Sequence, residues 1–226
     1  MAFVLTHRTL ELTTTTAERH MTTLEDGSQA ELNAQTTLVV DFKRDERRVR
    51  LMSGEALFTV AKDAKRPFVV ETSIGSVRVT GTVFNVRAAN TERVEVTVLE
   101  GTVRVRSSGN AAYEQPVTAG LQAAISNKAV IVRTLPEGAA QDATAWRQGQ
   151  VVFNDTPLSE AIERFAAYHA RAIVVDPKTA NLRLGGRFSL DDLNGFLESI
   201  ESVLPVQVSH QAGGDIRITA VETPAK

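Results

Sequence analysis

The chain has 226 residues, which allows one or two domains, and 42% of them are hydrophobic, enough for a packed core and too many for a disordered chain. Its formal net charge of −2 gives no electrostatic reason to expect a nucleic-acid partner, and the absence of cysteine excludes disulfides and thiolate zinc sites. No apolar run approaches the ~20 residues that a membrane-spanning helix needs, so we expect a soluble protein, or a soluble piece of a longer one.

Short β-strands are expected along the first part of the chain. Apolar side chains recur at every second position from Val49 to Val60 and from Val96 to Ser107, which places them on one face of a pleated strand. Each of these two segments has a glycine near its middle, Gly54 or Gly101, and glycine permits a turn that a residue with a Cβ would resist. The shared pattern therefore predicts two β-hairpins.

Weaker copies of this pattern surround the two segments. Gly27 and Gly120 stand at two further expected turns, and Gly81 interrupts the strand-like run Val77–Arg87, where it suggests a bulge or a tight bend. The simplest interpretation is a stack of short antiparallel strands that share one apolar face. The pattern leaves open whether the stack is a sandwich, a barrel or a solenoid-like arrangement.

The segment Leu135–Ala145 contains proline, glycine and small residues without hydrophobic periodicity. We interpret this segment as an interdomain linker. The expected organisation is an all-β domain at residues 1–135, a linker at 136–145 and a second domain at 146–226.

The period of the apolar residues changes after this linker. The order of expected elements is βαβ–βαββ, which describes a small α/β domain whose helices cover one face of a sheet. In the first helix, Thr156 is the expected N-cap and Pro157 the first helical residue, and Leu158, Ile162 and Phe165 lie along one apolar face.

A second strand–helix unit follows the expected strand Ala172–Val175. Ser189 is the expected N-cap of its helix, with Asp192 at the capping-box position. The last two strands are expected to form a hairpin around Gly213 and Gly214.

The sequence contains no recognisable constellation for catalysis or cofactor binding. None of the histidines lies at metal-ligand spacing with another histidine or a carboxylate, and no phosphate-binding loop, dinucleotide fingerprint or nucleophile elbow is present. The acidic pair Asp191-Asp192 fits the start of a helix better than acid–base chemistry. We therefore expect no metal, no cofactor and no enzymatic turnover. The four histidines are His7, His20, His169 and His210.

The bond between Gly81 and Thr82 has a chemistry of its own. A threonine hydroxyl can attack the carbonyl before it when the peptide is strained, and the resulting ester can be hydrolysed by water. Gly-Thr is also a common pair, and a bulge alone would explain this glycine.

Several segments together resemble the periplasmic part of FecR-family regulators. They are DGSQAELNAQTTLVV, RRVRLMSGEALFTVAKDAKRPFVVET, VRVTGTVFNVR, VTVLEGTVRV and WRQGQVVFNDTPLSEAIERFAAYH. The resemblance covers nearly the whole chain in order, and the C-terminal portion is similar to the short secretin and TonB N-terminal (STN) domain.

The resemblance implies a non-enzymatic sensor and transmission module in the periplasm. Such proteins also have a cytoplasmic anti-sigma segment and an inner-membrane helix, which this sequence lacks. The family receives a signal from the N-terminal signalling domain of a TonB-dependent outer-membrane siderophore transducer and passes it to an iron-starvation sigma factor. A periplasmic protease is an expected partner of the full-length protein, and no direct contact with siderophore is expected. Some members self-cleave at a Gly-Thr bond in the motif that Gly81-Thr82 matches.

The expected docking surface for the transducer combines the apolar strand Ile173, Val174 and Val175 with the helix side chains Leu158, Ile162 and Phe165. Burial in the core is the alternative reading of the same strand. The alternative function is a structural assembly module that interacts with a secretin-type pore. A hydrolase on a β scaffold is a third class, which lacks a catalytic constellation.

Overall fold

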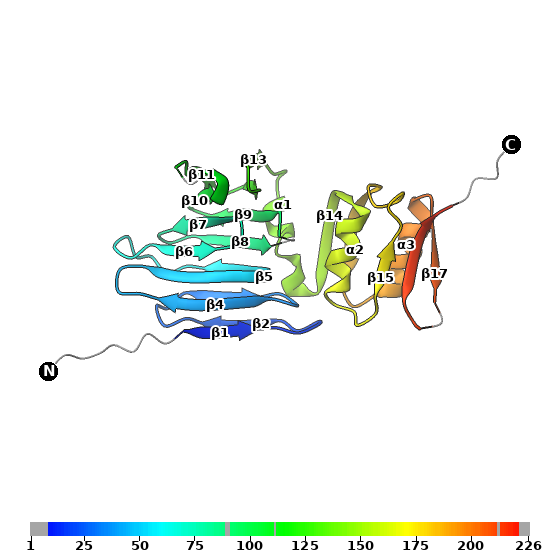
Figure 1. Cartoon of the computed structure of the whole chain (residues 1–226), viewed down its shortest axis with the longest axis horizontal. Coiled ribbons are helices and arrows are strands. Elements are labelled where there is room, and N and C mark those ends of the chain that lie inside the picture. The colour runs from blue at the N-terminus through cyan, green and yellow to red at the C-terminus, as the bar shows by residue number, and fades with distance from the viewer. Residues whose placement is uncertain (1–8, 89–90, 111, 212, 222–226) are drawn as a thin grey trace. The chain divides into compact units, whose positions relative to one another are not determined.

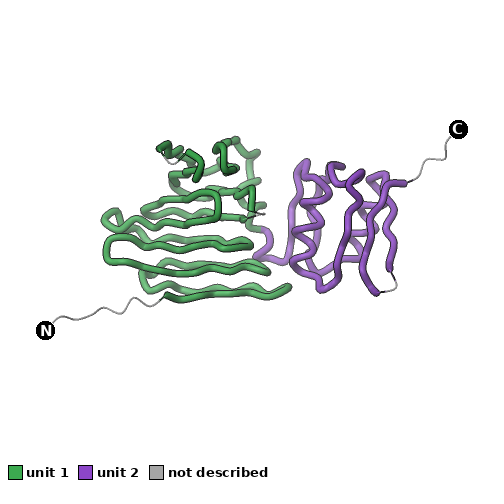
Figure 2. The backbone as a smooth tube through the Cα atoms, in the orientation of Figure 1, with its two compact units in different colours: residues 1–144 green, residues 145–226 purple. Residues whose placement is uncertain are grey.

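The structure, a computed structural model, describes residues 9–88, 91–110, 112–211 and 213–221. The chain divides into two compact units, Met1–Thr144 and Ala145–Lys226 (Figure 2). The fold is mainly β in the first unit and α/β in the second, as the sequence predicted.

The strands of the first unit are stacked, from β1 and β2 to β11 and β13 in Figure 1. Their bounds are β1 (Leu10–Thr13), β2 (His20–Thr23), β3 (Gln29–Leu32), β4 (Thr37–Phe42), β5 (Arg47–Thr59), β6 (Phe68–Glu71), β7 (Gly75–Val79), β8 (Val83–Ala88), β9 (Val94–Glu100), β10 (Thr102–Ser107), β11 (Gln115–Thr118), β12 (Leu121–Ile125) and β13 (Val130–Thr134). A 3-10 turn, η1 (Ser108–Asn110), follows β10.

These strands form two layers that share the long strand β5. The first half of β5 pairs with β4 and β6, and this layer continues through β7, β10 and β11. The second half of β5 pairs with β3 and β8, and this layer continues through β9, β12 and β13. All of these pairs are antiparallel except β5 with β6, which is parallel, so the expectation of a purely antiparallel stack is wrong at this one pair.

The two predicted hairpins are wrong, because Gly54 and Gly101 lie where the chain passes between the layers. β5 runs unbroken through Gly54, whose φ of +85° bends the strand from the first layer into the second. Gly101 has a φ of +82° and joins β9 of the second layer to β10 of the first, so these two strands do not pair with each other.

At two other glycines the chain also passes from one layer to the other. Gly81 lies at a bend between β7 and β8, and Gly120 between β11 and β12, and each connection changes layer. Gly27 is the exception, since it lies in the turn of the antiparallel hairpin β2–β3, as expected.

The core of the first unit lies between the two layers and is built from the alternating apolar side chains. Val49 and Leu51 from β5, Val77 from β7 and Val103 from β10 are at most 1% exposed. Phe58 joins the layers, with its ring centroid 5.5 Å from that of Phe84 and 5.7 Å from that of Phe68. Burial of such side chains stabilises the unit by ~1.5–3 kcal/mol each.

The segment expected to be an irregular linker contains a short helix, α1 (Ala139–Asp142). Gly138 precedes it with a φ of +80°, and the Ala140 side chain is buried. The helix contacts β9, so this part of the segment packs on the first unit.

The second unit follows the predicted order βαβ–βαββ. Its elements are η2 (Ala145–Gln148), β14 (Gln150–Pro157), α2 (Leu158–Ala166), β15 (Ile173–Val175), β16 (Arg183–Ser189), α3 (Leu193–Val203), β17 (Val206–His210) and β18 (Ile216–Ala220). The strands form two small sheets, β14–β16 and β15–β18–β17, rather than the expected single sheet. Both helices contact both sheets, because α2 meets β14, β15 and β16 while α3 meets β16 and β17.

The helix starts differ from the predicted caps by a few residues. Pro157 is the N-cap of α2 rather than its first helical residue, and the Thr156 hydroxyl accepts a hydrogen bond from the Asn154 amide instead of capping the helix. Asp192, not Ser189, caps α3, with its carboxylate accepting a hydrogen bond of 2.9 Å from the Gly195 amide.

Aromatic rings from both helices fill the core of the second unit. The rings of Phe165 on α2 and Phe196 on α3 are stacked with centroids 3.8 Å apart. Phe153 of β14 lies 6.4 Å from Phe165 and 6.2 Å from Phe196. The hairpin expected around Gly213 and Gly214 forms between β17 and β18.

Candidate functional site

The strand β15 lies at one edge of its sheet. Its three residues pair in parallel with Ile216, Arg217 and Ile218 of β18, and this is its one strand partner among the described residues. The Val174 side chain is 49% exposed, while Ile173 and Val175 are half-buried. An edge strand presents unpaired backbone groups, which another chain can pair with.

The other three expected docking residues lie elsewhere. Leu158 and Phe165 are fully buried and Ile162 is 3% exposed, so these α2 side chains belong to the core of the second unit. The structure therefore does not bring the six expected residues together on one surface. Of that set, only the β15 residues reach the surface.

A second candidate site is the bend that holds the Gly81-Thr82 bond. Gly81 has a φ of +153°, and a Cβ added there would lie 2.5 Å from Lys62 Cγ and 3.0 Å from Lys62 Cα. Both the conformation and this close approach require glycine. The bend is fixed on either side, since the Val60 amide donates to the Thr82 carbonyl and the Asp63 amide donates to the Thr80 carbonyl, each at 2.9 Å.

The side chain of Thr82 is buried at this bend. It is 6% exposed, and among the described residues its hydroxyl oxygen has no hydrogen-bond partner. Gly101 is close by, because a Cβ there would lie 2.8 Å from Thr82 Cγ2. A buried hydroxyl without a partner costs ~1–3 kcal/mol.

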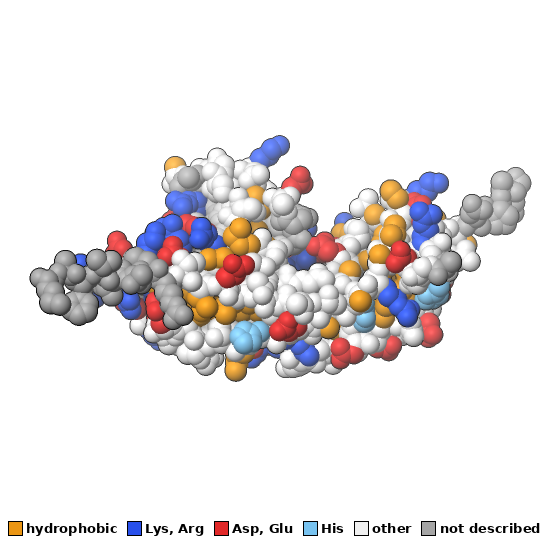
Figure 3. Space-filling view, turned by 60° about the horizontal axis from the view of Figure 1, so that its bottom comes forward, with side chains coloured by type: hydrophobic (Ala, Val, Ile, Leu, Met, Phe, Trp, Pro, Cys, Tyr) orange, Lys and Arg blue, Asp and Glu red, His pale blue; other side chains and the backbone are white. Residues whose placement is uncertain are grey.

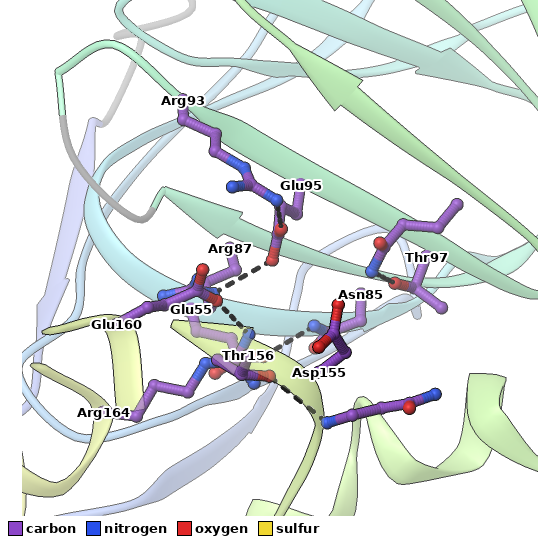
Figure 4. A network of polar contacts seen from close by, with 12 residues as sticks. Glu55, Asn85, Arg87, Arg93, Glu95, Thr97, Asp155, Thr156, Glu160 and Arg164 are labelled. Carbon is purple, nitrogen blue, oxygen red and sulfur yellow. Dashed lines mark hydrogen bonds and ion pairs between the residues drawn. The ribbon is translucent and has the colours of Figure 1, made fainter. Parts of the chain in front are cut away.

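The charged and polar side chains of the second layer pair with one another (Figure 4). The Asn85 amide donates to Glu55 at 2.7 Å, and Glu95 accepts from Arg87 at 3.2 Å and from Arg93 at 2.5 Å. No group of three or more metal-ligating side chains occurs in the described part of the chain. These carboxylates are held by amides and guanidinium groups, as in a structural network.

An open groove of about 530 Å³ lies between β16 and α3. No sequence pattern predicted this groove. Two acidic residues line it, Asp192, which caps α3, and Glu198, and Phe188 and Phe196 form part of its wall. The Ser199 and Ser202 hydroxyls that line it donate to the Gly195 and Ser199 carbonyls of α3 at 2.6 and 2.8 Å.

Two family models match this sequence. The model of the FecR protein matches residues 11–104, and the model of the FecR C-terminal region matches residues 150–218. The chain belongs to the FecR family. The first match runs from β1 into β10 and contains the Gly81-Thr82 bond. The second runs from β14 into β18 and contains β15.

The fold of this FecR protein is similar to a protein of known structure. Two crystal structures of a candidate anti-sigma factor from Parabacteroides distasonis ATCC 8503 superpose with a TM-score of 0.84 at 27% sequence identity. The similarity covers 94% and 95% of this chain and 100% of the crystallised chains. No curated protein matches the sequence significantly.

Family and structural similarity together support a regulatory role in signalling for this FecR protein. The anti-sigma factor similarity suggests an interaction with a sigma factor. None of the described helices is long and apolar enough to cross a bilayer.

Proposed function

We propose that this chain is the periplasmic sensor and transmission module of an anti-sigma regulator anchored in the inner membrane. The second unit, an STN-like domain, binds the N-terminal signalling domain of a TonB-dependent siderophore transducer. The first unit relays this event toward a cytoplasmic segment that acts on an iron-starvation sigma factor. The siderophore itself stays on the receptor.

The observation that carries this proposal is the free edge of β15. Three residues of an edge strand offer backbone donors and acceptors to a partner strand, and the half-exposed Val174 adds an apolar contact. A partner domain of similar size would bury ~1,200–2,000 Å² in a stable complex.

Calorimetric titration of the chain with the periplasmic signalling domains of the host's own receptors tests the proposal. We expect one of these domains to bind the wild type and Val174→Arg to weaken that binding about tenfold or more, because the charge must be desolvated on docking. Since Val174 is a surface residue, the melting temperature should change little.

The matched control is Ile131→Arg, which places the same charge on β13, an edge strand of the first unit, where Ile131 is 68% exposed. It should bind like the wild type. Equal weakening by both variants would contradict docking at β15. Binding to a secretin pore subunit, with none to any receptor domain, would favour the assembly function instead.

We also propose a single self-cleavage at the Gly81-Thr82 bond. The Thr82 hydroxyl oxygen attacks the Gly81 carbonyl carbon, the C–N bond breaks, and the hydroxyl proton passes to the released Thr82 amine. Water then hydrolyses the ester, leaving a Gly81 carboxylate and a restored Thr82 hydroxyl. The buried hydroxyl without a partner and the φ of Gly81 support this step. The full-length regulator would then be a substrate for a periplasmic protease.

A further inference from the structure

The outward side of the first layer carries five arginines, which we call the arginine face. Alternation along β5, β7 and β10 places them there, since their neighbours in sequence, such as Val49, Val77 and Val105, point into the core. Lys and Arg side chains also gather over part of the first unit in Figure 3. The arginine face consists of Arg48, Arg50, Arg78, Arg104 and Arg106.

The strand register orders these arginines in rows. Arg48 lies opposite Val69 of β6, Val69 lies opposite Arg78, and Arg78 lies directly opposite Arg104. In the next row, Glu71 lies opposite Arg50 on β5 and Ser76 lies opposite Arg106 on β10.

In the part of the chain that the structure describes, ion pairs form on only one side of the arginine face. Glu46 accepts from Arg48 at 2.6 Å and lies 3.4 Å from Arg78, and Glu71 lies 3.1 Å from Arg48. Arg104 and Arg106 on β10 form no ion pair in the described part of the chain. Among the described residues, the guanidinium groups on the β10 side are therefore not neutralised by an ion pair.

The direct opposition of Arg78 and Arg104 is unfavourable for the sheet. Like charges on directly opposite residues destabilise a strand pair. Arg104 is exposed, and the apolar core on the other side of β10 is complete without it. The packing of the first unit thus gives no reason for arginine at this position, whereas a negatively charged partner would.

We infer that the arginine face binds an extended acidic segment of a partner protein. Arg104 and Arg106 are two residues apart on one strand, which separates them by ~6.6–6.8 Å, and an extended segment with carboxylates at alternate positions has the same repeat. The guanidinium group binds carboxylates in a planar, bidentate manner. Glu46 and Glu71 lie among the arginines and would repel a continuous anionic surface, so a bilayer fits the face less well than discrete carboxylates do.

Fluorescence anisotropy with the whole chain tests this inference. The probes are a labelled peptide that alternates Glu and Thr, a peptide of the same composition with its Glu residues grouped together, and vesicles containing phosphatidylglycerol. We expect the alternating peptide to bind best, and more weakly as salt is raised. The double variant R104T/R106T should bind the alternating peptide at least about tenfold more weakly than the wild type does. Its melting temperature should equal or exceed that of the wild type, because the opposition of Arg78 and Arg104 is removed.

The matched control is R133T/R217T, which removes two exposed strand arginines, one on β13 of the second layer and one on β18 of the second unit. Its affinity for the alternating peptide should lie within about twofold of the wild-type affinity. This change is well below the tenfold loss expected for R104T/R106T. Equal loss in both double variants, no binding of either peptide, or binding of vesicles alone would overturn the inference. Equal binding of both peptides would overturn the alternate spacing that it states.

Discussion

At the scale of single residues, the Thr82 hydroxyl is the group whose placement most needs an explanation. It is buried at a bend where the backbone on both sides is fixed by hydrogen bonds, yet among the described residues it has no partner of its own. A valine of the same shape would avoid the ~1–3 kcal/mol cost of an unsatisfied hydroxyl. Attack on the neighbouring Gly81 carbonyl would give this hydroxyl a function that valine cannot supply.

The proposed self-cleavage predicts a defined pair of fragments in aged protein. Mass spectrometry should find one fragment that ends at Gly81 and one that starts at Thr82. Thr82→Ala should abolish both because it removes the attacking oxygen, while Thr82→Ser keeps a hydroxyl and should still cleave. The control Thr80→Ala changes an exposed threonine two residues away and should cleave like the wild type. Wild type that stays intact through days of incubation would refute the proposal for this protein.

At the scale of elements, the chain passes between the two layers of the first unit at bends that contain glycine, which we call glycine corners. Gly54 and Gly120 have nearly the same φ, +85° and +81°, but different surroundings. A Cβ at Gly54 would lie 2.3 Å from Thr36 Oγ1 and 2.5 Å from Thr36 Cα, whereas a Cβ at Gly120 would have no heavy atom within 4 Å. The two positions therefore separate conformational cost from steric cost.

We predict that Gly120→Ala lowers the free energy of unfolding by ~1–2 kcal/mol, the cost of a left-handed conformation for an L-residue. Gly54→Ala should lower it by a further ~1–3 kcal/mol, because the chain around Thr36 must also move. Urea unfolding of both variants measures the difference. Equal losses of unfolding free energy in the two variants would mean that the chain around Gly54 moves to accommodate a Cβ at no further cost.

The same corners explain what the sequence could and could not predict about the elements. Alternation identified the strands correctly, because one apolar face per strand is a local property. Glycine near the middle of Val49–Val60 suggested a hairpin, and the structure has a bent, continuous β5 instead. A positive φ serves a hairpin turn and a change of layer equally well, and only pairing with strands distant in sequence distinguishes them.

At the scale of the whole chain, strand pairing between distant segments also determines which of the expected docking residues lie at an exposed edge. The run Ile173–Val175 is as apolar as a core strand. Its position at an edge became clear only from the structure, where β18 is its one strand partner among the described residues. Leu158, Ile162 and Phe165 followed a helical period that the structure confirms, but this period marks the core rather than a docking surface. The sequence motif located the Gly81-Thr82 bond, but only the structure shows that the Thr82 hydroxyl is buried.

The topology of the first unit predicts what becomes of the protein after cleavage. A cut between Gly81 and Thr82 separates β1–β7 from β8–β13 in the covalent chain, yet the two sets of strands are interleaved. In the first layer β7 pairs with β10 across the cut, and in the second layer β5 pairs with β8 along six residues. The core between the layers draws side chains from both fragments, including the adjacent rings of Phe58 and Phe84.

We therefore expect cleaved protein to give two bands on a denaturing gel but one peak, at the position of the intact chain, in native size-exclusion chromatography. Separation should require urea, because several kcal/mol of apolar burial and two strand pairs oppose it. The uncleavable Thr82→Ala variant provides the reference position. Fragments that elute separately without denaturant would show that the strand pairs across the cut are too weak to hold the unit together.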